Sequence, residues 1–230
     1  TAGVAQACVS SLLASGLSSS SVNKACALLS QTCREAIRDG LMDSSPMDSV
    51  RHPKRRADRS VVNYLPEEGR ELLKEMLSRW AVTPLTVAIR IAMYAGLREG
   101  EVCALRWEDA KLKRGLVWVR SAVGQGRGGS YVKGTKSDRP RDVYLPREAT
   151  GPMAELYRLQ GMPSGTSYLM TGTDRHYEPS KLCKSWRVIA ETLGLVGSEG
   201  RRVTFHDLRH TWATVAVASK EIDIKTISSA

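Results

Sequence analysis

One short segment of this sequence combines residue types that could handle a phosphate ester. Residues 206–210 read HDLRH and follow Thr204, a residue type that caps helices. On a helix His206, Arg209 and His210 share one face. An imidazole and a guanidinium on one face can contact the same phosphate, one moving a proton and the other stabilising charge. By itself the pattern is weak, because such pairs more often decorate a helix surface or surround a capped core histidine.

A second segment, AGLREGE, places Arg98 after a glycine that ends a helical pattern and Glu101 three residues later. The neighbours of Arg98 are largely apolar, so burying its guanidinium requires a partner, and Glu101 has the right spacing. Two interpretations stay open. The pair is either a structural ion pair, or an arginine held by a carboxylate and directed at an anion.

A third segment, GTKSDRPR, carries Lys136 between two strand-like stretches. A lysine at the tip of a hairpin is usually just exposed. Two arginines, a lysine and a histidine are nevertheless the set that phosphoryl transfer uses. The cations stabilise charge on the nonbridging oxygens, and the lysine or histidine moves the proton of the leaving oxygen.

The order A-G-L-R-x-G-E, T-K-S-x-R-x-R and H-D-L-R-H-T resembles the tyrosine recombinase (phage integrase) family, which includes integrases of phages and mobile elements. Each motif is modestly specific, whereas all three in this order are highly specific. The resemblance covers nearly the whole chain. It implies that residues 1–50 form part of a helical core-binding domain that clamps DNA, that 51–63 form a basic linker, and that 64–230 form the catalytic domain.

The resemblance also assigns roles to individual residues. Arg98 and Arg209 would clamp the scissile phosphate, Lys136 would protonate the departing 5′ oxygen, and His206 would assist proton movement. Glu101 matches the acidic residue that supports the first arginine. His210 matches a position that supports or packs rather than reacts.

The sequence departs from the family pattern after the second arginine. The family continues with a Leu-Gly-His-like segment and a nucleophilic tyrosine, but the last tyrosine here is Tyr177, which precedes Arg209. We therefore assign no nucleophile, regard the catalytic domain as lacking its C-terminal segment, and expect this chain to bind DNA without cleaving it.

The implied function is that of a site-specific DNA recombinase (integrase), which cleaves and rejoins duplex DNA through a 3′-phosphotyrosyl intermediate to integrate or excise a mobile element. No cofactor and no metal are expected, because the sequence has no clustered acidic and histidine ligand set. The alternatives are a Xer-like chromosome-dimer resolvase and a non-catalytic DNA-binding module.

Charge supports a polyanionic partner, with nucleic acid ahead of an anionic membrane. The chain has a formal charge of +10 and a pI near 9.6. Nine basic residues and one acidic residue lie between Lys111 and Arg141, and five basic residues lie between Arg51 and Arg59. We expect duplex DNA as partner, no membrane, and a homo-oligomer on DNA, up to a synaptic tetramer in the full-length protein. The candidate DNA contacts are Arg51, Lys54, Arg55, Arg56, Lys133, Arg139 and Arg141.

Hydrophobic periodicity and capping residues predict the elements that must position these groups. The fold class is mainly α with a small antiparallel β-sheet (α+β). Strands are predicted at Leu116–Arg120 and in two hairpin arms, YVKGT and RDVYLP, around Lys136–Pro140, whereas the glycine-rich 124–130 are predicted to form a flexible loop. Helices are predicted at 4–14, 17–40, 66–80, 84–95, 147–160, 179–193 and 206–219, with a short last one from Ile222.

Compartment follows from two further observations. The most apolar stretch, Thr86–Leu97, carries Arg90 and is too short to span a membrane, and the N-terminus has no export signal. Five cysteines without a CxxC pair suit reduced thiols in the cytoplasm of a bacterium or phage host. Cys26 and Cys33 fall on one helical stripe and are expected to pack in a core.

Overall fold

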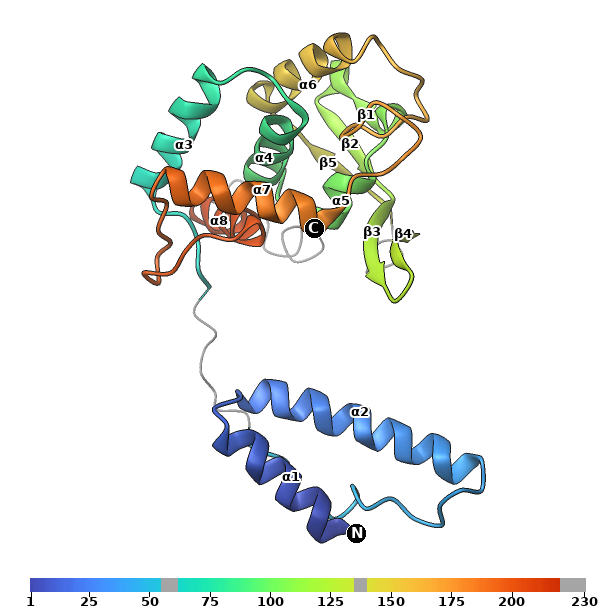
Figure 1. Cartoon of the computed structure of the whole chain (residues 1–230). Coiled ribbons are helices and arrows are strands. Elements are labelled where there is room, and N and C mark those ends of the chain that lie inside the picture. The colour runs from blue at the N-terminus through green and yellow to red at the C-terminus, as the bar shows by residue number, and fades with distance from the viewer. Residues whose placement is uncertain (55–61, 135–139, 220–230) are drawn as a thin grey trace. The chain divides into compact units, whose positions relative to one another are not determined.

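The computed structural model describes residues 1–54, 62–134 and 140–219 and is drawn in Figure 1. The chain forms two compact units, Thr1–Val61 and Val62–Ala230. Helices dominate and the strands are few, short and antiparallel, which confirms the predicted fold class. The short helix predicted from Ile222 lies outside the described residues. Over the described ranges, no helix is long and apolar enough to cross a membrane.

The N-terminal unit is a pair of helices, α1 (Ala2–Ala14) and α2 (Ser19–Arg38). The Ser18 hydroxyl accepts a hydrogen bond from the backbone N–H of Ser21 at 3.2 Å and so caps α2. Cys26 is buried, in line with the predicted helical stripe. The core of this unit consists of Val9, Val22, Cys26, Met47 and Val50.

The C-terminal unit is built around α4 (Pro84–Ala95), which is buried over most of its length (Figure 1). Thr83 and Thr86 exchange side-chain to backbone hydrogen bonds at the start of α4, with Pro84 in the first helical position. Helix α4 packs against the later helices α5, α6, α7 and α8. The bounds of the other helices are Glu67–Arg79 (α3), Glu99–Ala104 (α5), Arg147–Leu159 (α6), Pro179–Thr192 (α7) and Phe205–Ser219 (α8).

The strands form two separate sheets rather than one. The first has the antiparallel order β1-β2-β5, and the second is the hairpin β3-β4. Gly126 pairs with Gly129 at the end of this hairpin, so a two-residue turn joins its strands. The bounds are Ala110–Lys111 (β1), Leu116–Val119 (β2), Ser121–Gly126 (β3), Gly129–Gly134 (β4) and Arg141–Tyr144 (β5), with short 3₁₀ turns at Trp107–Asp109 and Leu112–Arg114.

The predicted hairpin around Lys136 is therefore wrong. Its two arms, YVKGT and RDVYLP, contribute to different sheets, because β4 pairs with β3 and β5 pairs with β2. The glycine-rich segment 124–130, predicted as a loop, includes the ends of β3 and β4 and their turn. The physical reason is burial. Val143 in β5 is buried opposite Val117 and joins the core sheet, whereas the last four residues of β4 are exposed.

Hairpin β3–β4 rests on α5 through a glycine. A Cβ atom on Gly100 would lie 2.5 Å from the backbone oxygen of Val123 in β3, which is closer than atoms can approach. Gly100, the second glycine of the AGLREGE segment, is thus needed for the close approach of β3 to α5.

Candidate active site

The turn between α4 and α5 holds Arg98 against Glu101 as the spacing predicted. The carboxylate of Glu101 accepts hydrogen bonds from both the backbone N–H and the Nη1 of Arg98, each at 3.0 Å. The side chain of Glu101 is only 2% exposed, whereas that of Arg98 is 37% exposed. A buried carboxylate therefore fixes an arginine that still reaches solvent, as an anion-binding group requires.

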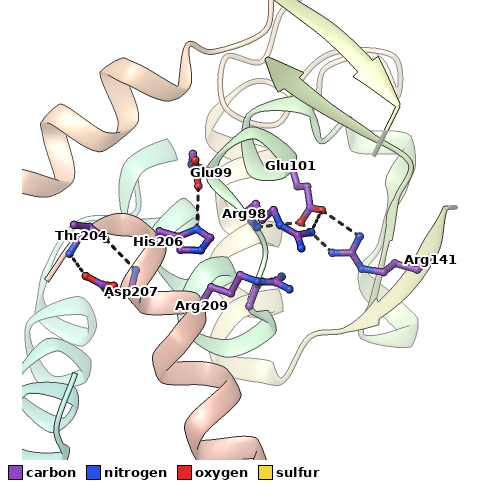
Figure 2. Close-up of polar contacts among 9 residues, drawn as sticks. Arg98, Glu99, Glu101, Arg141, Thr204, His206, Asp207 and Arg209 are labelled. Atoms are coloured by element: carbon purple, nitrogen blue, oxygen red, sulfur yellow. Dashed lines mark hydrogen bonds and ion pairs between the residues drawn. The ribbon is translucent and has the colours of Figure 1, made fainter. Parts of the chain in front are cut away.

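The HDLRH segment meets this turn through Arg209 and Trp212. Arg209 on α8 donates a short hydrogen bond from its Nη1 to the backbone oxygen of Gly96. Gly96 ends α4 with a φ of 63°, and a Cβ there would lie 2.3 Å from Cε3 of Trp212. Figure 2 shows Arg209 extending from α8 toward the Arg98–Glu101 pair. Two motifs that are distant in sequence thus form one cluster.

The start of α8 is fixed by a residue to which the sequence assigned no role, the buried Asp207. Its carboxylate accepts hydrogen bonds from the backbone N–H of Thr204 at 2.8 Å and from the Nδ2 of Asn63 at 3.2 Å. The Thr204 hydroxyl accepts one from the backbone N–H of Asp207 in return (Figure 2). The T-x-x-D spacing is a capping signal that could have identified this residue. By capping α8, Asp207 sets the orientation of the helix that carries His206 and Arg209.

His206 faces a second acidic residue that the sequence did not single out, Glu99. The Nδ1 of His206 lies 3.7 Å from the Oε2 of Glu99 (Figure 2). The ring centroids of His206 and His210 are 4.8 Å apart. The distance between Nδ1 and Oε2 exceeds that of a hydrogen bond, but catalytic contacts are often long before substrate binds. The contact with His206 lowers the pKa of Glu99. A carboxylate at Nδ1 leaves Nε2 of the imidazole available to a substrate.

A third arginine joins the cluster from β5. Arg141 donates from Nη1 to Oε1 of Glu101 at 3.2 Å and from Nη2 to Oε2 at 3.0 Å, a bidentate pair. Its side chain is 16% exposed. The sequence predicted Arg141 as a DNA contact and did not predict its pairing with Glu101, because the register of β5 is not visible in the sequence.

The cluster carries a surplus of positive charge. The guanidinium groups of Arg98 and Arg141 contact the carboxylate of Glu101, and Arg209 lies within electrostatic range of Glu101 and Glu99, so three arginines face two carboxylates. Burial, and secondarily the proximity of Arg98, lowers the pKa of Arg209 to about 10. Burial and the nearby charge of Arg98 both disfavour the positive charge of Arg209. Binding of an anion beside Arg209 would offset both, so the site favours an anionic ligand.

Residues 63–230 of the chain match the phage integrase family. This chain belongs to the phage integrase family of tyrosine recombinases. The shufflon-specific DNA recombinase of Escherichia coli is 29% identical over 174 residues, which cover 74% of this chain and 36% of that protein. The putative prophage phiRv2 integrase of Mycobacterium tuberculosis is 28% identical over 196 residues, which cover 84% and 50% of the two chains. The chain thus spans half or less of the length of these relatives.

The fold of this integrase chain is also that of a solved structure. The Tn1549 transposon integrase in complex with transposon right end DNA aligns with a TM-score of 0.72 over 99% of this chain and 75% of the other, at 18% sequence identity. At this identity the likeness concerns the fold alone.

The remaining predicted site residues of the integrase chain are less informative. Lys136, Arg55, Arg56 and Arg139 lie outside the described residues. Arg51, Lys54 and Lys133 are exposed. His210 is partly buried beside His206, and burial lowers its pKa.

Two predicted properties concern metals and thiols. No group of three or more His, Cys, Asp or Glu side chains that could hold a metal ion occurs among the residues that the structure describes.

All five cysteines are free thiols. Burial raises the pKa of Cys103, which makes it an unreactive core residue.

Proposed function

We propose that this chain provides the phosphate-binding and proton-transfer groups of a site-specific DNA recombinase that integrates or excises a mobile element. The observation that carries the proposal is the convergence of Arg98 and Arg209 beside one buried carboxylate, with His206 on the same face of α8 as Arg209. Such a cluster suits a phosphodiester, whose nonbridging oxygens accept charge-assisted hydrogen bonds from guanidinium groups.

In the proposed mechanism each group has one task. Arg98 and Arg209 bind the nonbridging oxygens of the scissile phosphate and stabilise the pentavalent transition state. Lys136 protonates the departing 5′ oxygen, and His206 moves a proton at the phosphate. The nucleophile is a tyrosine, which forms a 3′-phosphotyrosyl bond that a 5′ hydroxyl later displaces. No tyrosine follows Arg209 in the 230 residues, so none of the present residues receives that role.

The partner in this proposal is duplex DNA, bound by a homo-oligomer. The related proteins support recombination more firmly than integration, because one is described as a DNA recombinase and the other as an integrase at nearly equal identity. A chromosome-dimer resolvase therefore remains the alternative within the same chemistry. The DNA sequence that the protein selects from a random pool separates the two, since a resolvase site lies in the chromosome and an integrase site at the ends of an element.

The experiment that tests the proposal measures strand joining, which needs no tyrosine in the protein. A selected duplex carries a nick with a 3′-(4-nitrophenyl) phosphate on one side and a 5′ hydroxyl on the other, placed at each position of the site in turn. The hydroxyl oxygen attacks phosphorus, the bond to the nitrophenyl oxygen breaks, and 4-nitrophenolate leaves while the hydroxyl proton is taken up by a base. We expect the chain to accelerate nitrophenolate release at one position.

Two variants complete the test. Arg209→Ala should reduce joining by about a hundredfold or more, since removing one preorganised donor costs that much, while affinity for duplex DNA changes little. Arg158→Ala, at an exposed position on α6, is the control and should leave the rate unchanged. A wild-type chain that binds DNA but joins no strands at any position would favour the non-catalytic DNA-binding module.

A further inference from the structure

Glu101 is shared by two arginines in a manner that leaves it no capacity for a third. Oε1 accepts from the Nη1 of Arg98 and the Nη1 of Arg141, and Oε2 accepts from the backbone N–H of Arg98 and the Nη2 of Arg141 (Figure 2). The carboxylate is buried, so its charge is not screened by water. Without Arg141 this charge would act on Arg98, which it contacts, and on Arg209.

The charge balance of the cluster gives Arg141 a distinct role. The guanidinium groups of Arg98, Arg141 and Arg209 and the carboxylate of Glu101 sum to two positive charges with Arg141 and to one without it. Glu99 also acts on Arg98 and Arg209, and its charge is offset when His206 beside it is protonated. A phosphodiester carries one negative charge, whereas its pentavalent transition state carries two. A surplus of two therefore matches the transition state better than the ground state, the condition for catalysis rather than binding.

We propose that Arg141 is a positioning residue that neutralises Glu101, so that the full charge of Arg98 acts on the transition state. This inference rests on the proposed function and concerns how its site discriminates charge. Arg141 need not contact DNA for this. The Nε of Arg141 is buried and has no acceptor among the described residues, which agrees with a side chain held by Glu101 rather than by solvent.

A purely structural role predicts different behaviour. If Arg141 only packed β5 against α5, its removal would lower the affinity for every anion equally, and removing Glu101 as well would lower the affinity further. If Arg141 cancels the charge of Glu101, its removal lowers the affinity for a dianion more than that for a monoanion. Removing both side-chain charges then leaves the two positive charges of Arg98 and Arg209, so the double variant regains affinity for the dianion.

The test uses two small anions as probes, sulfate with two charges and dimethyl phosphate with one, at constant ionic strength. Binding to the whole chain is followed through the ¹⁵N–¹H signals of the Nε groups of Arg98 and Arg209. The variants are Arg141→Met, Glu101→Gln/Arg141→Met and Arg141→Lys. The control is Arg158→Met, which lowers the net charge equally at an exposed position on α6. Thermal unfolding verifies that each variant folds.

We expect Arg141→Met to lower the affinity for sulfate about tenfold and that for dimethyl phosphate about threefold, because the lost Coulomb energy scales with the charge of the ligand. The double variant should recover most of the sulfate affinity. Arg141→Lys should keep the wild-type ratio of the two affinities, since it keeps the charge. Arg158→Met should change both affinities less than about twofold, because exposed charges are screened.

The outcomes separate the inference from the function beneath it. Equal losses for both anions in Arg141→Met, or a double variant no better than the single one, would overturn the role of Arg141 and leave the phosphate site intact. A wild-type chain whose Arg98 and Arg209 signals respond to neither anion would overturn the phosphate site itself, and the role of Arg141 with it.

Discussion

At the scale of single residues, the site depends on carboxylates that hold cations in place. Glu101 fixes Arg98 and Arg141, and Glu99 faces the Nδ1 of His206. The two carboxylates differ in burial, since Glu101 is almost wholly buried and Glu99 is only partly so. Only the pairing of Glu101 with Arg98 follows from local spacing. The pairing of Glu99 with His206 joins two helices, which is why the sequence alone did not predict it.

A prediction about Glu99 follows from the direction of its pKa shift. The contact with His206 lowers the pKa of Glu99 in the folded chain. Glu99 therefore contributes stability above its unfolded pKa and loses this contribution as the pH falls through its folded pKa. Glu99→Gln should lower the free energy of unfolding at pH 6 by at most about 1 kcal/mol, because the side chain is partly exposed. The difference should shrink as the pH falls below the unfolded pKa of about 4.3 and vanish below the lower folded pKa.

Urea unfolding of both proteins across this pH range provides the measurement. Glu155→Gln, at an exposed position on α6, serves as the control and should show little difference at any pH. A Glu99→Gln difference that grew as the pH fell below about 4, where the carboxylate takes up its proton, would contradict the contact.

At the scale of elements, the site is assembled where one helix ends and two begin. Helix α4 ends at Gly96, α5 begins after Arg98, and the ring of Trp212 on α8 covers the intervening glycine. This close approach brings the side chain of Arg209 to the backbone oxygen of Gly96. The stability of the site and its geometry are thus linked through one residue without a side chain.

Replacing Gly96 with alanine should therefore be costly. The residue has a positive φ, and an added Cβ would overlap the Trp212 ring. We expect Gly96→Ala to lower the free energy of unfolding by about 2 kcal/mol or more. Gly194→Ala is the matched control, because Gly194 has the same φ of 63° but open space around it. That change should lower the free energy of unfolding by only about 1 kcal/mol, the strain of a residue with a side chain at positive φ. Equal effects of the two substitutions would argue against the close contact.

The elements also show what the sequence could and could not predict. Caps such as Thr83 with Pro84 and the terminator Gly96 are local signals, so the predicted helices are present in the described residues. The pairing of strands is not local. Strand β5 pairs with β2 and buries Val143, whereas β4 pairs with β3 and leaves its last four residues exposed, so the pairing depends on contacts distant in sequence. The position of Arg141 follows from that pairing and was missed for the same reason.

At the scale of the whole molecule, the formal charge of +10 should govern affinity for DNA. The logarithm of the binding constant should fall linearly with the logarithm of salt concentration. Lys133→Ala should reduce the slope by about 0.9, the contribution of one phosphate contact. Lys74→Ala is the control, since this lysine pairs with Glu71 on α3. Titration of labelled duplex at several salt concentrations measures the slope for each variant. A slope unchanged by Lys133→Ala would contradict a phosphate contact by Lys133.

The most direct test of the proposed site is the position of a phosphate in a crystal structure of this chain with its selected duplex DNA. We predict one phosphodiester with its nonbridging oxygens about 3 Å from guanidinium nitrogens of both Arg98 and Arg209, and with the imidazole of His206 facing one of its oxygens. Arg141 should remain bidentate on Glu101 in that complex. A duplex bound with every phosphate remote from Arg98 and Arg209 would contradict the assignment of this cluster as a phosphoryl-transfer site.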